Sequence, residues 1–180
     1  EIADDSSAQD IAPTKGTIQF TDQDLGDNIT FSVQGNANAL YNGAAVPNDP
    51  AVDISNLIAA NAISFEAPLT SDGGQQTIDW TFNPQAADLD WLKDGDTLSL
   101  SWTAQINDGH GLQGAQQLTI TIGGTNDLPT IDASTNPLQI AEIADDSSAQ
   151  DIAPTKGTIQ FTDQDLGDNI TFSVQGNANA

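Results

Sequence analysis

The amino-acid sequence predicts an all-β protein, an antiparallel β-sandwich of about seven short strands. Apolar and polar residues alternate with a period of two over several segments, which is the pattern of a strand with one buried face. Gly, Pro, Asn and Asp gather between these segments, as they do in turns. In addition, residues 1–39 recur without change as residues 142–180, so the chain is built on a 141-residue period.

The expected strands can be placed in chain order from the alternation alone. In the clearest of them, Leu98, Leu100 and Trp102 alternate with small polar residues. Shorter alternating runs indicate the others, and the last is a candidate first strand of a following unit. The expected strands are 18–20, 29–33, 63–65, 78–82, 97–106, 118–122 and 138–140.

Segment 50–62 breaks the period of two. Val52, Leu57 and Ile58 stand at roughly helical spacing within it. We therefore expect a short helix or turn inserted on the sandwich.

The three tryptophans are of two kinds. Trp80 and Trp102 stand on the apolar faces of expected strands, so we expect both in the core. Trp91 stands between strands, in the run Leu-Asp-Trp-Leu. We expect it to plug one end of the sandwich rather than to bind a sugar.

The composition limits what the chain can bind. It has 26 acidic residues against three lysines and one histidine, and its formal charge is −23. So few cations cannot neutralise phosphates, which excludes nucleic acid and anionic membranes as expected partners. The absence of cysteine excludes disulfides, thiolate metal sites and thiol nucleophiles. No apolar run is long enough to span a bilayer.

Nearly all the acids are Asp, since only Glu1, Glu66 and Glu142 are Glu. The short Asp side chain suits turns and holds its oxygens close to the backbone. The net charge would strain a compact fold by self-repulsion unless counter-ions bind. Calcium takes about six to eight oxygen ligands and needs no nitrogen or sulfur, so Ca²⁺ is the expected cofactor.

The best linker is segment 123–129, which reads Gly-Gly-Thr-Asn-Asp-Leu-Pro. A boundary there gives residues 1–127, a β-sandwich repeat lacking its first strand, and residues 128–180, the N-terminal part of the next identical repeat. The copies 1–39 and 142–180 can also compete for one set of strand positions, which leaves strand exchange between molecules open. An arbitrary end point within a tandem array is an equal alternative.

The sharpest motif joins two expected strands and reads Phe-Thr-Asp-Gln-Asp-Leu-Gly-Asp-Asn. Its carboxylates are Asp22, Asp24 and Asp27 in the first copy, and Asp163, Asp165 and Asp168 in the second. Carboxylates so close together repel one another unless a divalent cation joins them. The spacing is not that of an EF-hand, and an Asp-rich turn without an ion is the alternative.

Three weaker motifs follow along the chain. They are Asp94-Gly-Asp96 before the longest strand, Asp108-Gly-His110 in the turn after it, and Asn126-Asp127 in the linker. Each is ordinary turn chemistry by itself. Because His110 lies between two glycines, we expect it to be a turn residue rather than a catalytic base.

Segments 16–27, 91–111 and 118–131 carry these motifs in a fixed order, and together they resemble the VCBS-type, cadherin-like repeats of giant bacterial RTX adhesins. The resemblance covers about three quarters of the period and leaves out residues 40–62. It implies Ig-like or cadherin-like sandwiches in tandem arrays, secreted by a type I system to the surface of a Gram-negative cell. There the arrays extend a ligand-binding tip in cell adhesion and biofilm formation.

The resemblance also implies which residues bind calcium. The implied ligands are Asp22, Asp24, Asp27 and Asp108 at the top of the first unit, Asn126 and Asp127 in the linker, Asp163, Asp165 and Asp168 at the top of the second unit, and Glu1, Asp94 and Asp96 at the bottom of the first. Around the last three, the local sequence departs from the cadherin pattern.

The expected function is therefore that of a calcium-rigidified extender, whose partners are neighbouring identical repeats in the same chain. One alternative is a carbohydrate-binding or host-surface module that uses Trp91 and Tyr41. Another is a glycoside hydrolase with two carboxylates. No pair of acids stands in an apolar context that would raise one pKa, so we expect no enzyme activity.

Overall fold

The computed structural model describes residues 11–66, 68–135, 139–144 and 152–176. Within these ranges, nearly all regular structure is antiparallel β-strand, and helix is limited to two short turns. The all-β prediction is therefore confirmed.

Three strands form the first sheet, in the order β1-β6-β4. These are β1 (Thr14–Thr21), β6 (Gln75–Phe82) and β4 (Ile63–Phe65). Ile18 of β1 pairs with Ile78 of β6, and both side chains are buried. The alternation of the sequence thus turns one apolar face of this sheet inward.

The second sheet is built on β7 (Thr97–Asn107), which pairs along its whole length with β8 (Leu112–Gly123). The other edge of β7 pairs with β3 (Asn38–Tyr41) near the start of β7 and with β2 (Asn28–Val33) near its end. The short strand β5 (Leu69–Thr70) pairs antiparallel with β2 at the edge of this sheet.

The two sheets pack on one hydrophobic core. Trp102 of β7 and Phe82 of β6 are fully buried, and their ring centroids lie 5.6 Å apart. Trp80 and Trp91 are also buried, so both the expected core tryptophan and the expected plug are confirmed. We call residues 11–66 and 68–127 the two-sheet body.

The expected helix in segment 50–62 is present in a shortened form. It consists of α1 (Ser55–Ile58) and the 3₁₀ turn η1 (Ala60–Ala62). Leu57 is fully buried, and Val52 and Ile58 pack against the same core. The insertion therefore covers part of the body.

The strands β3, β5 and β9 were not expected from the alternation. β9 (Thr130–Ser134) pairs with β10 (Ile159–Thr162), so the strand after the linker lies earlier than the predicted 138–140. Gln139 and Ile140 are in no strand, and Leu138 lies outside the described residues. Ile131 is the one large apolar residue of β9, which explains why periodicity did not reveal it.

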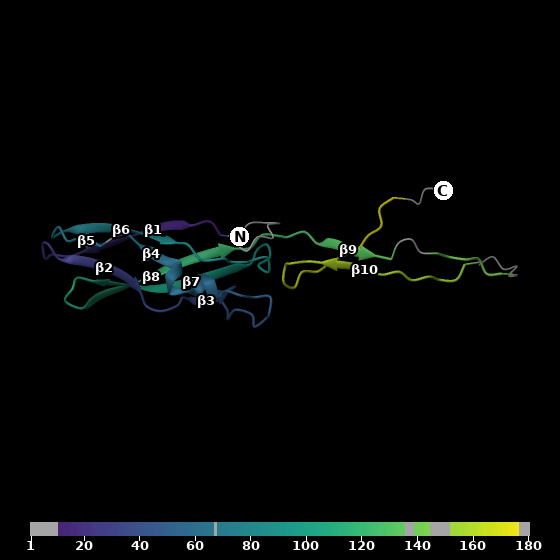
Figure 1. Ribbon diagram of the computed structural model, residues 1–180, viewed down its shortest axis with the longest axis horizontal. Coiled ribbons are helices and arrows are strands. Elements are labelled where there is room, and N and C mark those ends of the chain that lie inside the picture. Colours follow the sequence, from purple (N-terminus) through teal and green to yellow (C-terminus); the bar gives the residue numbers. More distant parts are fainter. Residues whose placement is uncertain (1–10, 67, 136–138, 145–151, 177–180) are drawn as a thin grey trace.

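The molecule is elongated (Figure 1). The strands of the body run roughly along the long axis, and the β9–β10 pair continues beyond one end. We call this the junction end. The opposite end carries the turn between β1 and β2 and the turn between β7 and β8.

Candidate metal centres

The loop between β1 and β2 lies at the far end of the body, and we call residues 22–28 the outer loop. The Asp24 amide donates to Asp22 Oδ1 at 2.9 Å, which closes an Asx turn. Gly26 adopts a φ of +96°, which a residue with a side chain rarely takes. The Gly26 amide donates to Ser71 O, and the Ser71 amide donates to Asp27 O. This backbone clamp fixes the loop on the body.

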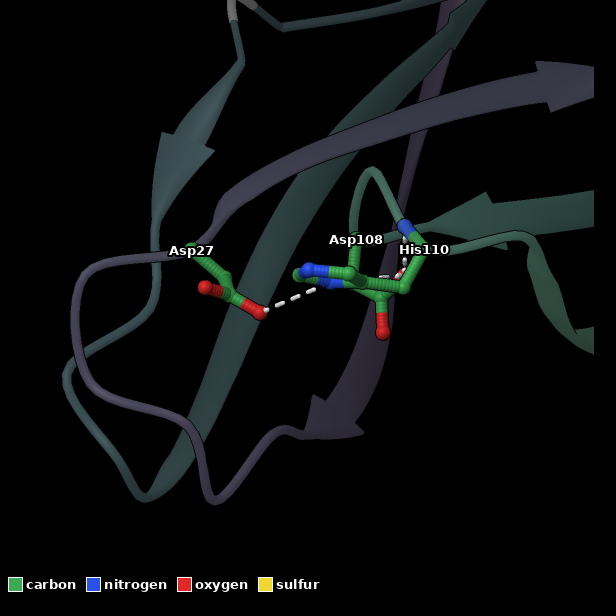
Figure 2. A group of neighbouring side chains, drawn as sticks. All are labelled: Asp27, Asp108 and His110. Atoms are coloured by element: carbon green, nitrogen blue, oxygen red, sulfur yellow. Dashed lines mark hydrogen bonds and ion pairs between the residues drawn. The ribbon is translucent and has the colours of Figure 1, made fainter.

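The outer loop brings its acids together with the β7–β8 turn. Ligand atoms of Asp22, Asp24 and Asp27 lie within 4.8 Å of one another, and so do those of Asp27, Asp108 and His110. Figure 2 shows the His110 ring between the two carboxylates, with Nδ1 at 3.5 Å from Asp27 Oδ2 and 3.9 Å from Asp108 Oδ1. The four acids expected at the top of the first unit thus lie in two groups that share Asp27, and His110 is an unforeseen neighbour in one of them.

The identical loop of the second copy, residues 163–169, lies at the junction end, and we call it the junction loop. It keeps the same Asx turn, since the Asp165 amide donates to Asp163 Oδ1 at 3.1 Å. The Leu166 amide donates to Trp91 O at 3.2 Å, and Gln164 donates to Asp90. The loop is therefore docked on the end of the body.

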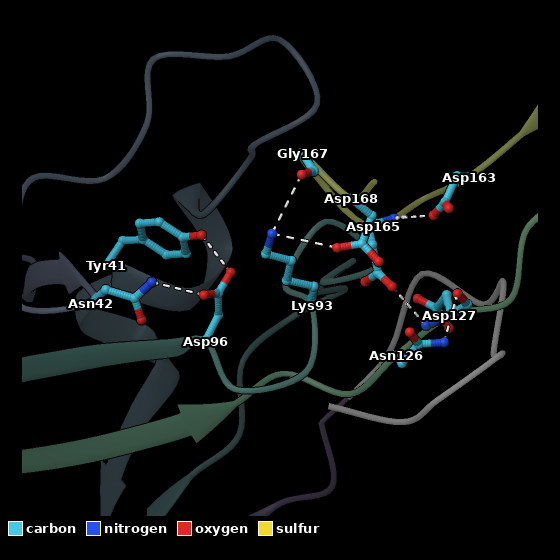
Figure 3. A network of polar contacts seen from close by, with 10 residues as sticks. All are labelled: Tyr41, Asn42, Lys93, Asp96, Asn126, Asp127, Asp163, Asp165, Gly167 and Asp168. Atoms are coloured by element: carbon cyan, nitrogen blue, oxygen red, sulfur yellow. Dashed lines mark hydrogen bonds and ion pairs between the residues drawn. The ribbon is translucent and has the colours of Figure 1, made fainter. Parts of the chain in front are cut away.

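The linker contacts the same loop. The Asp127 amide donates to Asp165 Oδ2 at 2.9 Å, with both residues buried (Figure 3). Asn126 donates to the carbonyl of Asp127. Linker and loop, expected to face each other across a calcium site, are thus adjacent.

Docking gives one loop sequence two environments. Asp24 is exposed in the outer loop, whereas its copy Asp165 is only 4% exposed. Leu25 is 80% exposed, whereas its copy Leu166 packs against the core. Burial of Asp165 raises the pKa of its carboxyl; the Asp127 amide opposes this change, and the charges of Asp168, Asp127 and Asp163 add to it.

One oxygen of this buried carboxylate has no protein partner. Asp165 Oδ2 accepts the hydrogen bond from Asp127, while the buried Oδ1 has none among the described residues. A buried carboxylate oxygen without a donor is costly. A bound cation would remove that cost.

Lys93 is the single cation of the junction among the described residues. Its ammonium lies 3.4 Å from Asp168 Oδ1 and 3.5 Å from Gly167 O. Both charged side chains are about one-third exposed, so the pair is screened by solvent and contributes little. It balances only part of the acid around it.

The remaining predicted ligands lie elsewhere. Asp96 is buried, and its two carboxylate oxygens accept hydrogen bonds from Tyr41 and Asn42 within the body (Figure 3). Asp94 is exposed, and Glu1 lies outside the described residues. Among the described residues, three ligand atoms lie within 4.8 Å of one another at the outer loop, but not at the junction.

Sequence reasoning missed two polar residues of the junction, Asp90 and Lys93. The available signal was the run Asp88-Leu89-Asp90, a second pair of acids one residue apart beside a buried Trp91. The Asp90 amide donates to Asp88 Oδ1 at 3.2 Å, as in the two loops.

The donor set has a clear chemical character. Carboxylate and amide oxygens predominate at both ends, and such hard donors suit Ca²⁺ better than soft metals. Comparison with family models, curated proteins and solved structures found no match to this chain. None of the helices in the described part is long and apolar enough to cross a membrane.

Proposed function

We propose that this chain is a calcium-rigidified structural extender, or spacer, of a bacterial surface adhesin. Its unit would be an Ig-like, cadherin-like β-sandwich repeated every 141 residues, secreted by a type I system to the surface of a Gram-negative cell. There it serves cell adhesion and biofilm formation. The proposal rests on the residues of the chain, because no relative assigns a role to it.

The observation that carries the proposal is the burial of Asp165 at the junction. A carboxylate that is 96% buried, accepts one hydrogen bond and has a second oxygen without a partner calls for a cation. Asp127, Asp163 and Asp168 lie near enough for their charges to add to the raised pKa of its carboxyl. Ca²⁺ fits, because its coordination is flexible and can include waters where protein ligands are too few.

Calcium would act here by joining two covalently linked parts. Asp127 belongs to the linker and Asp165 to the following unit, so an ion bound to both removes hinge freedom between them. An ion bound only to the docked state stabilises it by RT ln(1 + [Ca²⁺]/Kd), about 2.7 kcal/mol at a calcium concentration of 100 Kd. Without calcium, the same carboxylates repel one another and weaken docking.

The outer loop extends the argument to an array. It repeats the sequence and the Asx turn of the junction loop at the opposite end of the body. A unit placed before this one would meet Asp22, Asp24 and Asp27 as this body meets the junction loop. Each unit would then bind the acidic loop of the next unit at one end and present its own acidic loop to the preceding unit at the other end.

The structure offers less support for a carbohydrate module. Trp91 is 2% exposed, and the Tyr41 ring packs 5.8 Å from it. The Trp91 ring therefore presents no open face on which a sugar could stack, and Tyr41 is itself half-buried. We also propose no enzyme activity for the chain.

The test compares the protein in calcium and in chelator by small-angle scattering and thermal melting. We expect a single extended shape and a higher Tm in calcium, and a broader range of shapes in chelator. Magnesium at equal ionic strength controls for general screening of the −23 charge. Identical scattering and melting in calcium and chelator would overturn the proposal.

A matched pair of variants localises the effect. Asp165→Asn removes a carboxylate from the junction, and Asp24→Asn removes its copy from the outer loop. Asp165→Asn should lose the calcium-dependent change in shape, whereas Asp24→Asn should keep it. Equal loss in both variants would place the stiffening ion elsewhere.

A further inference from the structure

We propose that one molecule binds a second copy of itself by strand exchange. In the exchanged form, β10 of one molecule and the following residues 169–174 occupy the place of β1 and β2 in the body of the next, and β9 is added beside β10. The partner is thus residues 40–127 of a second chain. This inference does not depend on calcium.

The first reason is that one sequence is buried in one copy and exposed in the other. Ile18 in β1 is 5% exposed, whereas its copy Ile159 in β10 is 52% exposed. Val33 packs against the core, whereas its copy Val174 is 95% exposed. Since residues 142–180 are identical to residues 1–39, the second copy fits the body as well as the first.

Part of the second copy already holds the required conformation. Phe20 and Phe31 of the body form an edge-to-face pair with ring centroids 5.3 Å apart. Their copies Phe161 and Phe172 form the same pair at 5.2 Å, although they lie outside the body. Such preorganisation lowers the entropic cost of docking.

The edge of β10 that would pair with β6 is not the edge used by β9. The Thr135 amide donates to Thr158 O on the β9 side, and Thr158 is the copy of Thr17. In the body, the Asp22 amide donates to Gly74 O on the β6 side. Positions 17 and 22 are an odd number apart, so in an extended strand they face opposite edges. β10 can therefore pair with β9 and β6 together.

Exchange also brings a gain. The replacement itself leaves the contacts within the body unchanged, because the incoming segment is identical to the one it replaces. The incoming segment, however, brings β9, which adds a strand beside the β1 position, where the described residues contain no pairing partner on that edge. It also gives Ile131, 69% exposed, a sheet to pack on. Covering an open edge and an apolar side chain favours the exchanged form.

The linker directs the exchange to another molecule. Thr130 pairs with Thr162, the copy of Thr21, so in a docked segment Thr130 lies at the outer end of the body. Gly123 pairs with Thr97 at the junction end. The body measures about 33 Å along β7, whereas the seven residue steps from Gly123 to Thr130 reach at most about 25 Å. The segment cannot reach this place in its own body, so it must dock on another molecule, through a head-to-tail contact.

Engineered cysteines test the exchange directly, because the chain contains none. Gln19 pairs with Thr77 across β1 and β6, on an exposed face. In the Gln160→Cys/Thr77→Cys variant, Gln160 is the copy of Gln19, so a disulfide joins two molecules only after exchange. We expect ladders of dimers and higher species on non-reducing gels after unfolding and refolding at high protein concentration.

Three controls decide the result. Gln19→Cys/Thr77→Cys should cross-link within one monomer, and Gln160→Cys alone should give far fewer dimers. Adding Ile159→Asp should abolish the ladder and leave the monomer folded, because Ile159 lies outside the body. A monomeric Gln160→Cys/Thr77→Cys protein, an equal dimer yield from Gln160→Cys alone, or a ladder that survives Ile159→Asp would each overturn the proposal.

Discussion

Identical residues behave differently at the two ends of this molecule. Asp24 and Asp165 have the same neighbours in sequence and the same Asx turn. Only Asp165 is buried, and this burial raises the pKa of its carboxyl. The difference comes from the docking surface, which desolvates one carboxylate and leaves the other in water. The role of a residue therefore depends on which of the two identical segments contains it.

Gly16 shows the same dependence for packing. A Cβ at this position would lie 2.5 Å from Cζ2 of Trp80, whose ring covers the glycine. We predict that Gly16→Ala lowers the unfolding free energy by about 1–3 kcal/mol through overpacking. Gly157→Ala, in the second copy, should change it little. Urea denaturation at low protein concentration measures both, and equal effects would contradict the packing argument.

Tyr41 and Asp96 form a part-buried pair whose strength depends on pH. The hydrogen bond to Asp96, then burial, then repulsion from its charge raise the pKa of Tyr41 to about 12. A raised pKa means that the folded state favours the protonated phenol. The stabilisation is therefore complete below the ordinary value of 10.0 and is lost as pH rises through about 12.

This prediction has a direct readout, because Tyr41 is the only tyrosine of the chain. Ultraviolet absorbance should show tyrosinate forming near the raised pKa in the folded protein and near the ordinary value in urea. In Tyr41→Phe, stability should lose this pH dependence. A folded-state titration at the ordinary pKa would refute the pairing.

At the scale of elements, the sequence predicted the strands whose apolar residues alternate. β1, β2, β6, β7 and β8 were all foreseen, because each buries one face in the core. β3, β5 and β9 are short and are held by pairing with distant strands, which no local pattern reveals.

The same limit applies to the candidate site. The acidic loops could be found as motifs, and the structure brings Asp22, Asp24 and Asp27 together as expected. Sequence alone could not show that Asp96 bonds within the body or that Asp90 contacts the junction loop. The Asp96 contact depends on how residues distant in sequence meet within the body, and the Asp90 contact depends on how the second copy docks on its surface.

The linker offers a test at this scale. A Cβ on Gly124 would lie 1.9 Å from Leu92 O, so the linker must bend away from the body if that glycine is replaced. We predict that Gly124→Ala undocks the junction loop and speeds hydrogen exchange at the Asp127 amide, which donates to Asp165. Gly123→Ala is the matched control, since its Cβ would meet nothing within 4 Å. Unchanged exchange in Gly124→Ala would show that docking tolerates a displaced linker.

At the scale of the whole molecule, charge and shape belong together. The acids of the outer loop and those of the junction loop lie at opposite ends of an elongated body, where neighbouring units would meet. Self-repulsion then favours separation along the axis, and a cation at each joint opposes it. The proposed calcium dependence and the proposed strand exchange both act at these ends, and chelator separates them, because only the first requires the metal.

Because both sides of the junction lie within one 141-residue period, every added period brings one more body and one more loop to dock on it. Growth of such a chain creates no new kind of interface. A substitution made in every copy of the loop therefore changes the contacts at each junction. It also changes the one loop at the free end, which is docked on no neighbour. The free end is the place where such a change can be studied apart from docking.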